Sequence, residues 1–200
     1  MQQLSLAILP PRDPTLGNFV AGANAEALSR LRDLRDGRLA ESVVYLWGEP
    51  GSGCSHLLAA CARPGITLAD DVQRLDDAAQ VALFNRINEA REQGGAVLAA
   101  GDAPPAQLRL REDLRSRLGW GLVYQVKPLT DAEKAVYMRA EGERRGLALT
   151  DEVIWYLLSH VRRDMPSLDA LIDHLDRQSL EKQRRITLPL VREVLKSIET

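Results

Sequence analysis

A short apolar run that passes directly into a glycine-rich loop constrains this chain more than any other feature. Residues 43–47 form a continuous β-branched and aromatic stretch, and GEPGSGCS at 48–55 follows with the spacing G-x-x-x-x-G-x-S. A continuous apolar stretch of this length is typical of a buried parallel strand. A loop of this spacing between a strand and a helix is typical of a P-loop. The pattern therefore predicts an α/β fold.

The predicted sheet has four parallel strands, and its α/β lobe is one strand short. Only 16 positions separate Cys54 from Asp70, which leaves room for one helix and one strand between them. Loss of a strand at the sheet edge removes one ladder and leaves the core intact. The other strands are expected at 66–69, 96–100 and 122–126, and helices begin at Asn24, a candidate N-cap, near Cys54 and near Ala79.

An all-helical lobe is predicted to follow the α/β lobe. Strand patterns cease after Pro128, and four helical patterns follow, one of them with Thr150 as its candidate N-cap and another opened by Thr187. At the other end, prolines interrupt a short apolar segment and predict an extended tail. We therefore expect an extended tail at 1–16, an α/β lobe at 17–128 and a helical lid lobe at 129–200.

Charge and composition exclude several functional classes. The chain has 26 basic and 28 acidic residues, a net charge of −2, so it lacks the positive charge of an autonomous duplex-DNA binder. Its two cysteines, Cys54 and Cys61, have no metal-ligand spacing and argue against a zinc site or a disulfide framework. No apolar run approaches membrane-spanning length, and no secretion signal is recognised. We expect a soluble, cytoplasmic protein that does not contact membranes.

The P-loop match implies a phosphate-binding site, but the lysine of such a loop is missing. In such a loop, backbone N–H groups hold phosphates, a lysine adds positive charge and a hydroxyl binds Mg²⁺. Here Cys54 occupies the lysine position, while Ser55 keeps the hydroxyl. One interpretation is a loop retained for its turn, with weak or no nucleotide binding; the other is functional ATP binding. The candidate loop residues are Gly48, Gly51, Gly53, Cys54 and Ser55.

Two consecutive carboxylates follow the predicted strand at 66–69. Asp70 and Asp71 resemble a Walker B pair, in which the first carboxylate holds Mg²⁺ together with Ser55 and the second orients the attacking water. The alternative is an N-cap and an acidic first turn for the next helix, where Asp is favoured for dipole reasons alone. Asp71 is thus a candidate catalytic residue, and Asp70 is a candidate nucleotide and Mg²⁺ ligand.

Several segments, in chain order, resemble the AAA+ module of the bacterial replication initiator DnaA. The resemblance covers nearly the whole chain, and its motifs are specific as an ordered set. Because no helix-turn-helix domain follows the lid-like lobe, the chain is most similar to the Hda group of DnaA-homologous regulatory inactivators. The segments are DPTLGNFVAG at 13–22, the P-loop, Asp70 with Asp71, LAAGDAPP at 98–105 and DLRSRLGWGL at 113–122.

The resemblance implies roles for residues near the third and fourth strands. Arg117 matches the arginine finger, which enters the nucleotide site of a neighbouring subunit; the alternative is a surface arginine in an arginine-rich loop. The family often has a further basic residue four positions earlier, where this chain has Asp113. Asp102 matches a polar sensor that contacts nucleotide, or it caps a turn. A sensor arginine of the family aligns with Pro166, so a second phosphate contact is absent.

The N-terminal segment QLSLAI at 3–8 resembles the Q-L-x-L-x-[LI] peptide with which replication proteins of this group bind the β sliding clamp. Such a peptide presents alternate apolar side chains to a pocket while a glutamine forms hydrogen bonds beside it. The alternative is a disordered start, or a strand that packs on its own domain. The candidate clamp-binding residues are Gln3, Leu4, Leu6 and Ile8.

These features together predict a DNA replication inhibitor that prevents re-initiation. While bound to the clamp, it stimulates hydrolysis of DnaA-bound ATP in trans through Arg117, and it is not expected to be an active ATPase by itself. The alternative is an autonomous P-loop ATPase or a nucleotide-gated replication loader. The expected cofactor is ADP or another nucleotide with Mg²⁺, bound weakly, or none. Expected partners are DnaA and the clamp, with DNA reached only through the clamp, and a homodimer is considered.

Overall fold

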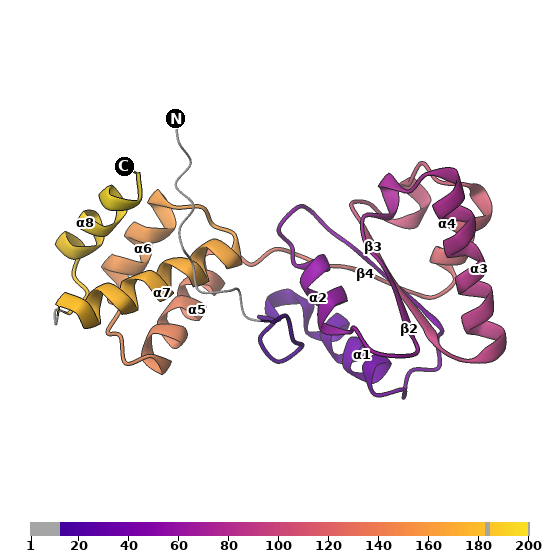
Figure 1. Ribbon diagram of the computed structural model, residues 1–200, viewed down its shortest axis with the longest axis horizontal. Coiled ribbons are helices and arrows are strands. Elements are labelled where there is room, and N and C mark those ends of the chain that lie inside the picture. The colour runs from indigo at the N-terminus through magenta and orange to yellow at the C-terminus, as the bar shows by residue number, and fades with distance from the viewer. Residues whose placement is uncertain (1–12, 183–184, 200) are drawn as a thin grey trace. The chain divides into compact units, whose positions relative to one another are not determined.

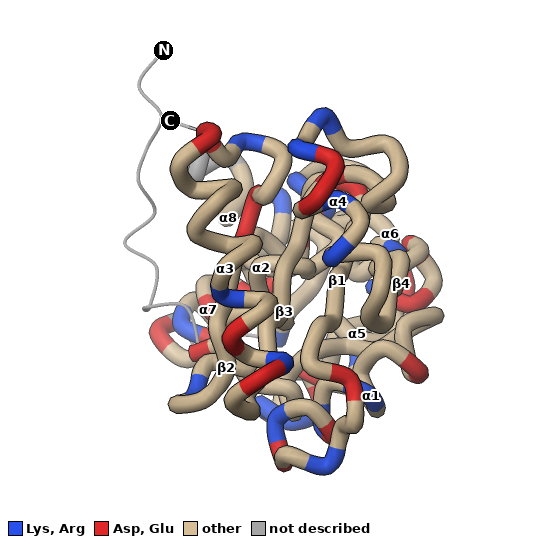
Figure 2. Tube along the Cα trace, turned by 90° about the vertical axis from the view of Figure 1, so that its right-hand side faces the viewer, with Lys and Arg blue, Asp and Glu red and all other residues tan. Residues whose placement is uncertain are grey.

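The computed structural model describes residues 13–182 and 185–199, and these residues form two compact units (Figure 1). One unit spans Asp13–Pro128 and the other begins at Leu129. The candidate clamp-binding residues Gln3, Leu4, Leu6 and Ile8 lie outside the described residues. In Figure 2, acidic and basic positions are interspersed along the trace.

The first unit is built on a four-stranded parallel sheet, as predicted. Its strands follow the order β2-β3-β1-β4, with β1 paired to β3 and β4, and β2 paired only to β3. The second strand along the chain is therefore an edge strand, and the described residues contain no fifth strand between Cys61 and Asp70. The strands are β1 (Val43–Trp47), β2 (Ile66–Ala69), β3 (Ala96–Gly101) and β4 (Leu122–Gln125).

Each face of the sheet is covered by two helices, because apolar side chains alternate along the strands. Val44 and Leu46 pack with α1 (Ala25–Arg35) and α2 (Cys54–Ala60) on one face. Val43 and Tyr45 pack on the other face, which is covered by α3 (Asp77–Gln93) and α4 (Glu112–Gly119) (Figure 1). Helix α4 was not predicted, since its segment is rich in arginine; its two leucines, Leu114 and Leu118, are fully buried. Short 3-10 turns occur at Gly22–Asn24, Val72–Arg74 and Pro105–Gln107.

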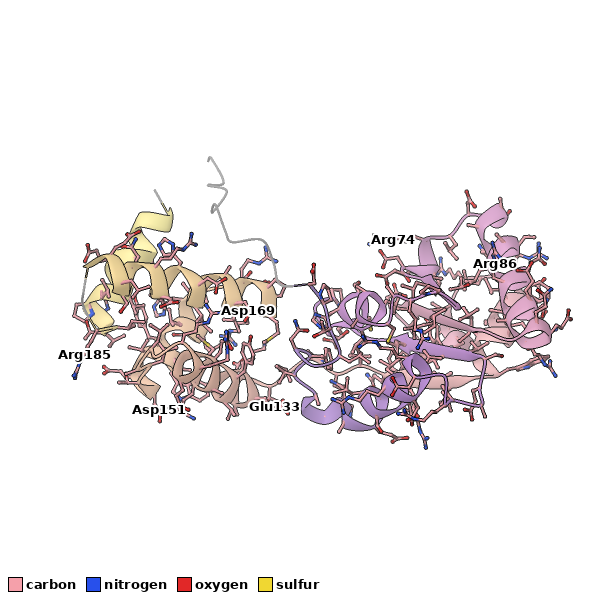
Figure 3. The ribbon with its side chains drawn as sticks, turned by 60° about the horizontal axis from the view of Figure 1, so that its bottom comes forward. Arg74, Arg86, Glu133, Asp151, Asp169 and Arg185 are labelled. Atoms are coloured by element: carbon pink, nitrogen blue, oxygen red, sulfur yellow. The ribbon has the colours of Figure 1, made fainter. Side chains whose placement is uncertain are left out.

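Among the described residues, the second unit contains four helices; two of them have threonine N-caps, of which Thr150 was predicted. Thr130 forms a capping box with Glu133, labelled in Figure 3, and Thr150 accepts a hydrogen bond from the Val153 N–H at 3.4 Å. Buried Glu141 pairs with Arg144, the last residue of its helix, and with Arg145, which follows it. The helices are α5 (Asp131–Arg144), α6 (Asp151–His160), α7 (Met165–Lys182) and α8 (Leu188–Glu199).

Residues 13–16, assigned above to an extended tail, fold onto the α/β unit. Leu16 is buried and packs with the cluster beneath α1 and α2. The Thr15 N–H donates to the Asn18 side-chain oxygen at 2.9 Å, and the Asn18 N–H donates to the Thr15 hydroxyl at 3.1 Å. This reciprocal pair closes a turn, so the tail ends earlier than expected because Leu16 contributes apolar area to the core.

Asn24 does not cap α1, contrary to the sequence-based expectation. Its side-chain amide donates to the Lys127 carbonyl and accepts from the Lys127 N–H, both at 2.8 Å. The residue is buried, so these two bonds satisfy the polar groups of both residues. Asn24 thereby ties the start of α1 to the segment that follows β4.

We predict that Asn24→Ala lowers the free energy of unfolding by about 2–3 kcal/mol, because two hydrogen bonds are lost and the Lys127 backbone is left unsatisfied. Urea unfolding of the full chain, followed by tryptophan fluorescence, measures this loss. Asn85→Ala is the matched control, since Asn85 is exposed on α3. A change of less than about 0.5 kcal/mol for Asn24→Ala, the range of ordinary surface substitutions, would contradict the prediction.

Candidate functional site

The candidate nucleotide residues gather at one edge of the sheet because each follows the carboxyl end of a parallel strand. The P-loop follows β1, Asp70 follows β2 and Asp102 follows β3. The Gly48 N–H donates to the Gly101 carbonyl at 3.3 Å, which joins the start of the P-loop to the end of β3. Ligands of parallel α/β sheets bind outside this edge, so it is the expected place for a nucleotide.

The P-loop has the backbone conformation of a phosphate-binding loop. Gly51 and Gly53 have φ of 86° and 103°, values that L side chains rarely adopt. A Cβ on Gly48 would lie 2.4 Å from the Val126 carbonyl, and one on Gly53 would lie 2.7 Å from the Phe19 ring. The loop therefore passes close to β4 on one side and to Phe19 on the other. These close approaches explain the glycines without reference to a ligand.

No positive charge stands at the P-loop position that lysine would occupy. Burial raises the pKa of the Cys54 thiol, the neighbouring charge of Asp70 raises it further, and a hydrogen bond with Ser52 at 3.5 Å partly offsets both effects. Cys54 is therefore a neutral thiol at neutral pH. The side chain at this position therefore supplies no charge to a phosphate group.

The two consecutive aspartates are in different environments. Asp70 accepts a hydrogen bond from the Asp71 N–H at 2.9 Å, and its charge affects Cys54. Asp71 is the one non-glycine residue with positive φ, 49°, within the described ranges. Its carboxylate accepts from the Gln73 amide at 3.0 Å and pairs with Arg74, labelled in Figure 3, at 3.1 Å. Of the pair, Asp70 is thus the residue directed toward the P-loop, while Asp71 is held by its neighbours.

Tyr45 is a further residue near this edge, and no role beyond that of a strand residue was predicted for it. Its hydroxyl is buried and donates to the Ala103 carbonyl at 2.8 Å. Burial raises the pKa of Tyr45 far above its usual value, and the negative charge of Asp102 adds to the effect. Tyr45 is therefore a neutral phenol at neutral pH. The signal for this role was a tyrosine, the one residue with a hydroxyl, at the centre of an apolar strand.

The residues proposed for Mg²⁺, Ser55 and Asp70, do not form a metal centre by themselves. No group of three or more His, Cys, Asp or Glu side chains suited to a metal occurs among the described residues. Mg²⁺ in nucleotide sites is held by one or two protein ligands together with phosphates. Ser55, exposed at the start of α2, and Asp70 would fit that arrangement only together with a bound nucleotide.

Arg117 lies at the opposite edge of the sheet from the P-loop. It shares a groove with residues 40–43, which lead into β1, and with Gly121, which precedes β4. Since β1 runs from this groove to the P-loop, the two edges are about 13 Å apart at roughly 3.3 Å per residue. Arg117 therefore does not reach a phosphate in its own P-loop.

The Arg117 side chain is held by aromatic rings and not by a carboxylate. Its guanidinium carbon lies 3.9 Å from the centroid of Trp120 and 5.5 Å from that of Phe84. One guanidinium nitrogen, Nη1, is buried with no hydrogen-bond partner in the described part of the chain. Cation–π contacts of this kind hold the cation in place while leaving its N–H donors available. Sequence reasoning did not foresee this contact with Trp120.

Comparison with solved structures places the α/β unit and the lid in one known class. Domain III of the Thermotoga maritima replication initiation protein DnaA matches with a TM-score of 0.75 and 21% identity over 96% of this chain and 99% of that one. AMPPCP-bound DnaA from Aquifex aeolicus matches with a TM-score of 0.68 and 19% identity, over 88% of this chain and 71% of that one. A Thermotoga maritima RuvB mutant matches with a TM-score of 0.66 and 17% identity, over 93% of this chain and 72% of that one. The chain has the AAA+ fold, with a helical lid after the α/β unit.

A family model narrows this class. Residues 131–195, which contain most of the four lid helices, match the lid domain of Hda. This part of the chain is therefore similar to the lid domain of Hda, and the chain as a whole has the fold of DnaA domain III. Within the described residues, no helix is long and apolar enough to cross a membrane.

Proposed function

We propose that this chain is an adaptor that stimulates hydrolysis of ATP bound to DnaA, with Arg117 entering the nucleotide site of that partner. The observation that carries the proposal is the separation of Arg117 from the chain's own P-loop by the length of β1. Because Arg117 lies at the far edge and has no acidic partner among the described residues, a phosphate that another molecule supplies is the ligand we propose for it. The Hda-type lid supports DnaA as that molecule.

The chemistry required of Arg117 is charge stabilisation. In the partner, water attacks the γ-phosphorus and the bond to the β–γ bridging oxygen breaks. ADP leaves, inorganic phosphate retains the oxygen of the water, and a proton passes to solvent. Negative charge spreads over the γ-phosphoryl oxygens in the transition state, and an arginine supplied in trans stabilises it. The Arg117 guanidinium, which is paired with no carboxylate among the described residues, would supply the positive charge and the N–H donors for this purpose.

The chain's own P-loop is proposed to bind nucleotide weakly. The backbone N–H groups of residues 51–55 would hold a diphosphate, and Ser55 and Asp70 would complete the Mg²⁺ shell. Cys54 adds no charge, and Pro166 stands where the family resemblance expects an arginine. Because phosphoryl transfer depends on accumulated positive charge, we do not propose that this chain is an autonomous ATPase. DnaA from Aquifex aeolicus has been solved with AMPPCP, which supports nucleotide as the ligand class.

Attachment to the β sliding clamp through Gln3, Leu4, Leu6 and Ile8 completes the proposal. The support is the QLSLAI sequence itself and its place ahead of the folded unit that begins at Asp13. Clamp attachment would raise the local concentration of the adaptor near newly replicated DNA, so the chain need not contact DNA directly. We propose a cytoplasmic protein that prevents re-initiation.

We predict that Arg117→Ala lowers the stimulated hydrolysis of DnaA-bound ATP by about a thousandfold or more, the range measured for arginine fingers supplied in trans. Single-turnover conversion of ATP to ADP on DnaA, with clamp-loaded DNA, measures the effect. Arg109→Ala is the control, because Arg109 is exposed just before α4. Clamp binding and thermal unfolding should be unchanged in both variants. Hydrolysis at the wild-type rate with Arg117→Ala would refute the finger.

We predict that Gln3→Ala combined with Leu6→Ala weakens binding to purified β clamp by at least about tenfold, since a polar anchor and a pocket-filling side chain are lost. Surface plasmon resonance with immobilised clamp measures the affinity. Gln2→Ala is the matched control, because Gln2 stands next to the motif but outside it. Equal affinity of the double variant and Gln2→Ala would remove the clamp assignment.

We predict that Cys54→Lys tightens ADP binding by about tenfold to a hundredfold, since one charge-assisted contact contributes roughly 1.5–3 kcal/mol. Calorimetry with Mg²⁺ present measures the affinity. Cys54→Ser is the control, because it keeps the position neutral. Submicromolar ATP affinity of the unmodified chain would contradict the weak site, and an unchanged affinity of Cys54→Lys would show that the loop does not hold phosphate.

A further inference from the structure

Arg117 is not the only cation beside Trp120. Arg91, from the last turn of α3, has its guanidinium carbon 5.4 Å from the centroid of the same ring. Trp120 is 60% exposed, so both arginines meet on an accessible aromatic side chain. Arg91 and Arg117 come from helices α3 and α4, and we call them, with Trp120, the finger surface.

Both arginines of the finger surface lack an acidic partner in the described ranges, unlike Arg86 of α3 and Arg111, which precedes α4. Arg86 of α3 pairs with Glu89 at 3.0 Å, and Arg111 pairs with Asp113 at 2.8 Å. Position 113, four residues before Arg117, thus carries a carboxylate that its neighbour neutralises. Two unneutralised guanidinium groups on one indole repel each other, and an anion between them relieves that repulsion.

The finger surface opens on a groove large enough for a phosphate chain. The groove has a volume of about 410 Å³ and is lined by Arg91, Arg117, Trp120 and Asn88, with Glu41 and Ser42 at the approach to β1. Arg91, Arg117, Trp120 and Asn88 all carry N–H donors, and Glu41 is the one acidic side chain among the residues that line the groove. Arg117 brings a buried nitrogen that has no acceptor in the described part of the chain. A polyphosphate supplies several acceptor oxygens at once.

We propose that Arg91 is a second cation of the finger surface, which contacts the same partner-bound nucleoside triphosphate as Arg117. The inference rests on the function proposed above and names a residue that the function does not require. Trp120 is the positioning residue, since both guanidinium groups contact its ring. During hydrolysis in the partner, Arg117 stabilises charge on the γ-phosphoryl group, and Arg91 binds phosphate oxygens of the triphosphate beside it.

The test compares Arg91→Ala, Arg91→Gln and Arg91→Lys with Arg86→Ala. Arg86, labelled in Figure 3, is the matched control because it lies on the same helix and already pairs with Glu89. Two quantities are measured with clamp-loaded DNA: the single-turnover rate of hydrolysis of DnaA-bound ATP, and the affinity of the chain for ATP-loaded and for ADP-loaded DnaA. The affinity ratio reports contact with the triphosphate, which a purely structural role of Arg91 would not change.

We expect Arg91→Ala and Arg91→Gln to slow hydrolysis by about tenfold to a hundredfold, the effect of one charge-assisted contact. Their preference for ATP-loaded over ADP-loaded DnaA should fall. Arg91→Lys should recover part of both quantities, and Arg86→Ala should match the wild type. The glutamine variant keeps most of the aliphatic stem, so it tests the charge if the alanine variant folds poorly.

The outcomes separate this inference from the proposed function. Suppose that Arg117→Ala abolishes stimulation, while Arg91→Gln matches Arg86→Ala in the rate of hydrolysis and in the preference for ATP-loaded DnaA. The role of Arg91 as a second cation is then refuted, and the role of Arg117 as an arginine finger is kept. If Arg117→Ala leaves the rate unchanged, the proposed function fails, and the second cation fails with it. Equal loss of affinity for both forms of DnaA in Arg91→Gln would also refute a contact with the triphosphate.

Discussion

The direction of the strands in the parallel sheet determines what each edge of the α/β unit can do. Because all four strands run the same way, the loops after β1, β2 and β3 meet at one edge. The connection from α4 to β4 lies at the other edge. The P-loop, Asp70 and Asp102 share the first edge, while Arg117 is at the second. This separation makes Arg117 unsuitable for its own site and suitable for a site on another molecule.

The distribution of charge agrees with that division. At the carboxyl edge, Cys54 is a neutral thiol in the P-loop, and Arg74 beside the acidic pair is bound to Asp71. At the amino edge, Arg91 and Arg117 have no acidic partner among the described residues, and an aromatic ring orders both. This distribution supports the proposal that the chain binds nucleotide weakly at its own P-loop and offers its positive charge to a nucleotide held by a partner.

Much of the fold follows from the order of apolar patterns in the sequence. The runs at 43–47, 66–69 and 96–100 are short, continuous and bounded by glycine or aspartate, so their strands and the missing fifth strand were predictable. Helix α4 was missed because arginines obscure two buried leucines that are four residues apart. The expected cap at Asn24 was wrong because its partner is Lys127, far along the chain, and local signals do not report such a contact.

Only the parts of the candidate site that lie in a single sequence motif, or directly after a predicted strand, were predictable. The P-loop and the residues that follow strands come together because the topology joins the strand ends, and strand patterns imply that topology. The meeting of Arg91 with Trp120 and Arg117 depends on how α3 and α4 pack on the sheet, so no motif contains it. Likewise, Tyr45 gains its role from burial next to Asp102 and Cys54, which the alternation of a strand does not reveal.

A structure of this chain bound to DnaA that carries a non-hydrolysable ATP analogue tests the central claim most directly. The account predicts that the Arg117 guanidinium lies within hydrogen-bond distance of the γ-phosphate held by DnaA, with the carboxyl edge and its P-loop away from that phosphate. A complex in which DnaA's nucleotide faces the P-loop edge of this chain, or lies beyond the reach of Arg117, would contradict it.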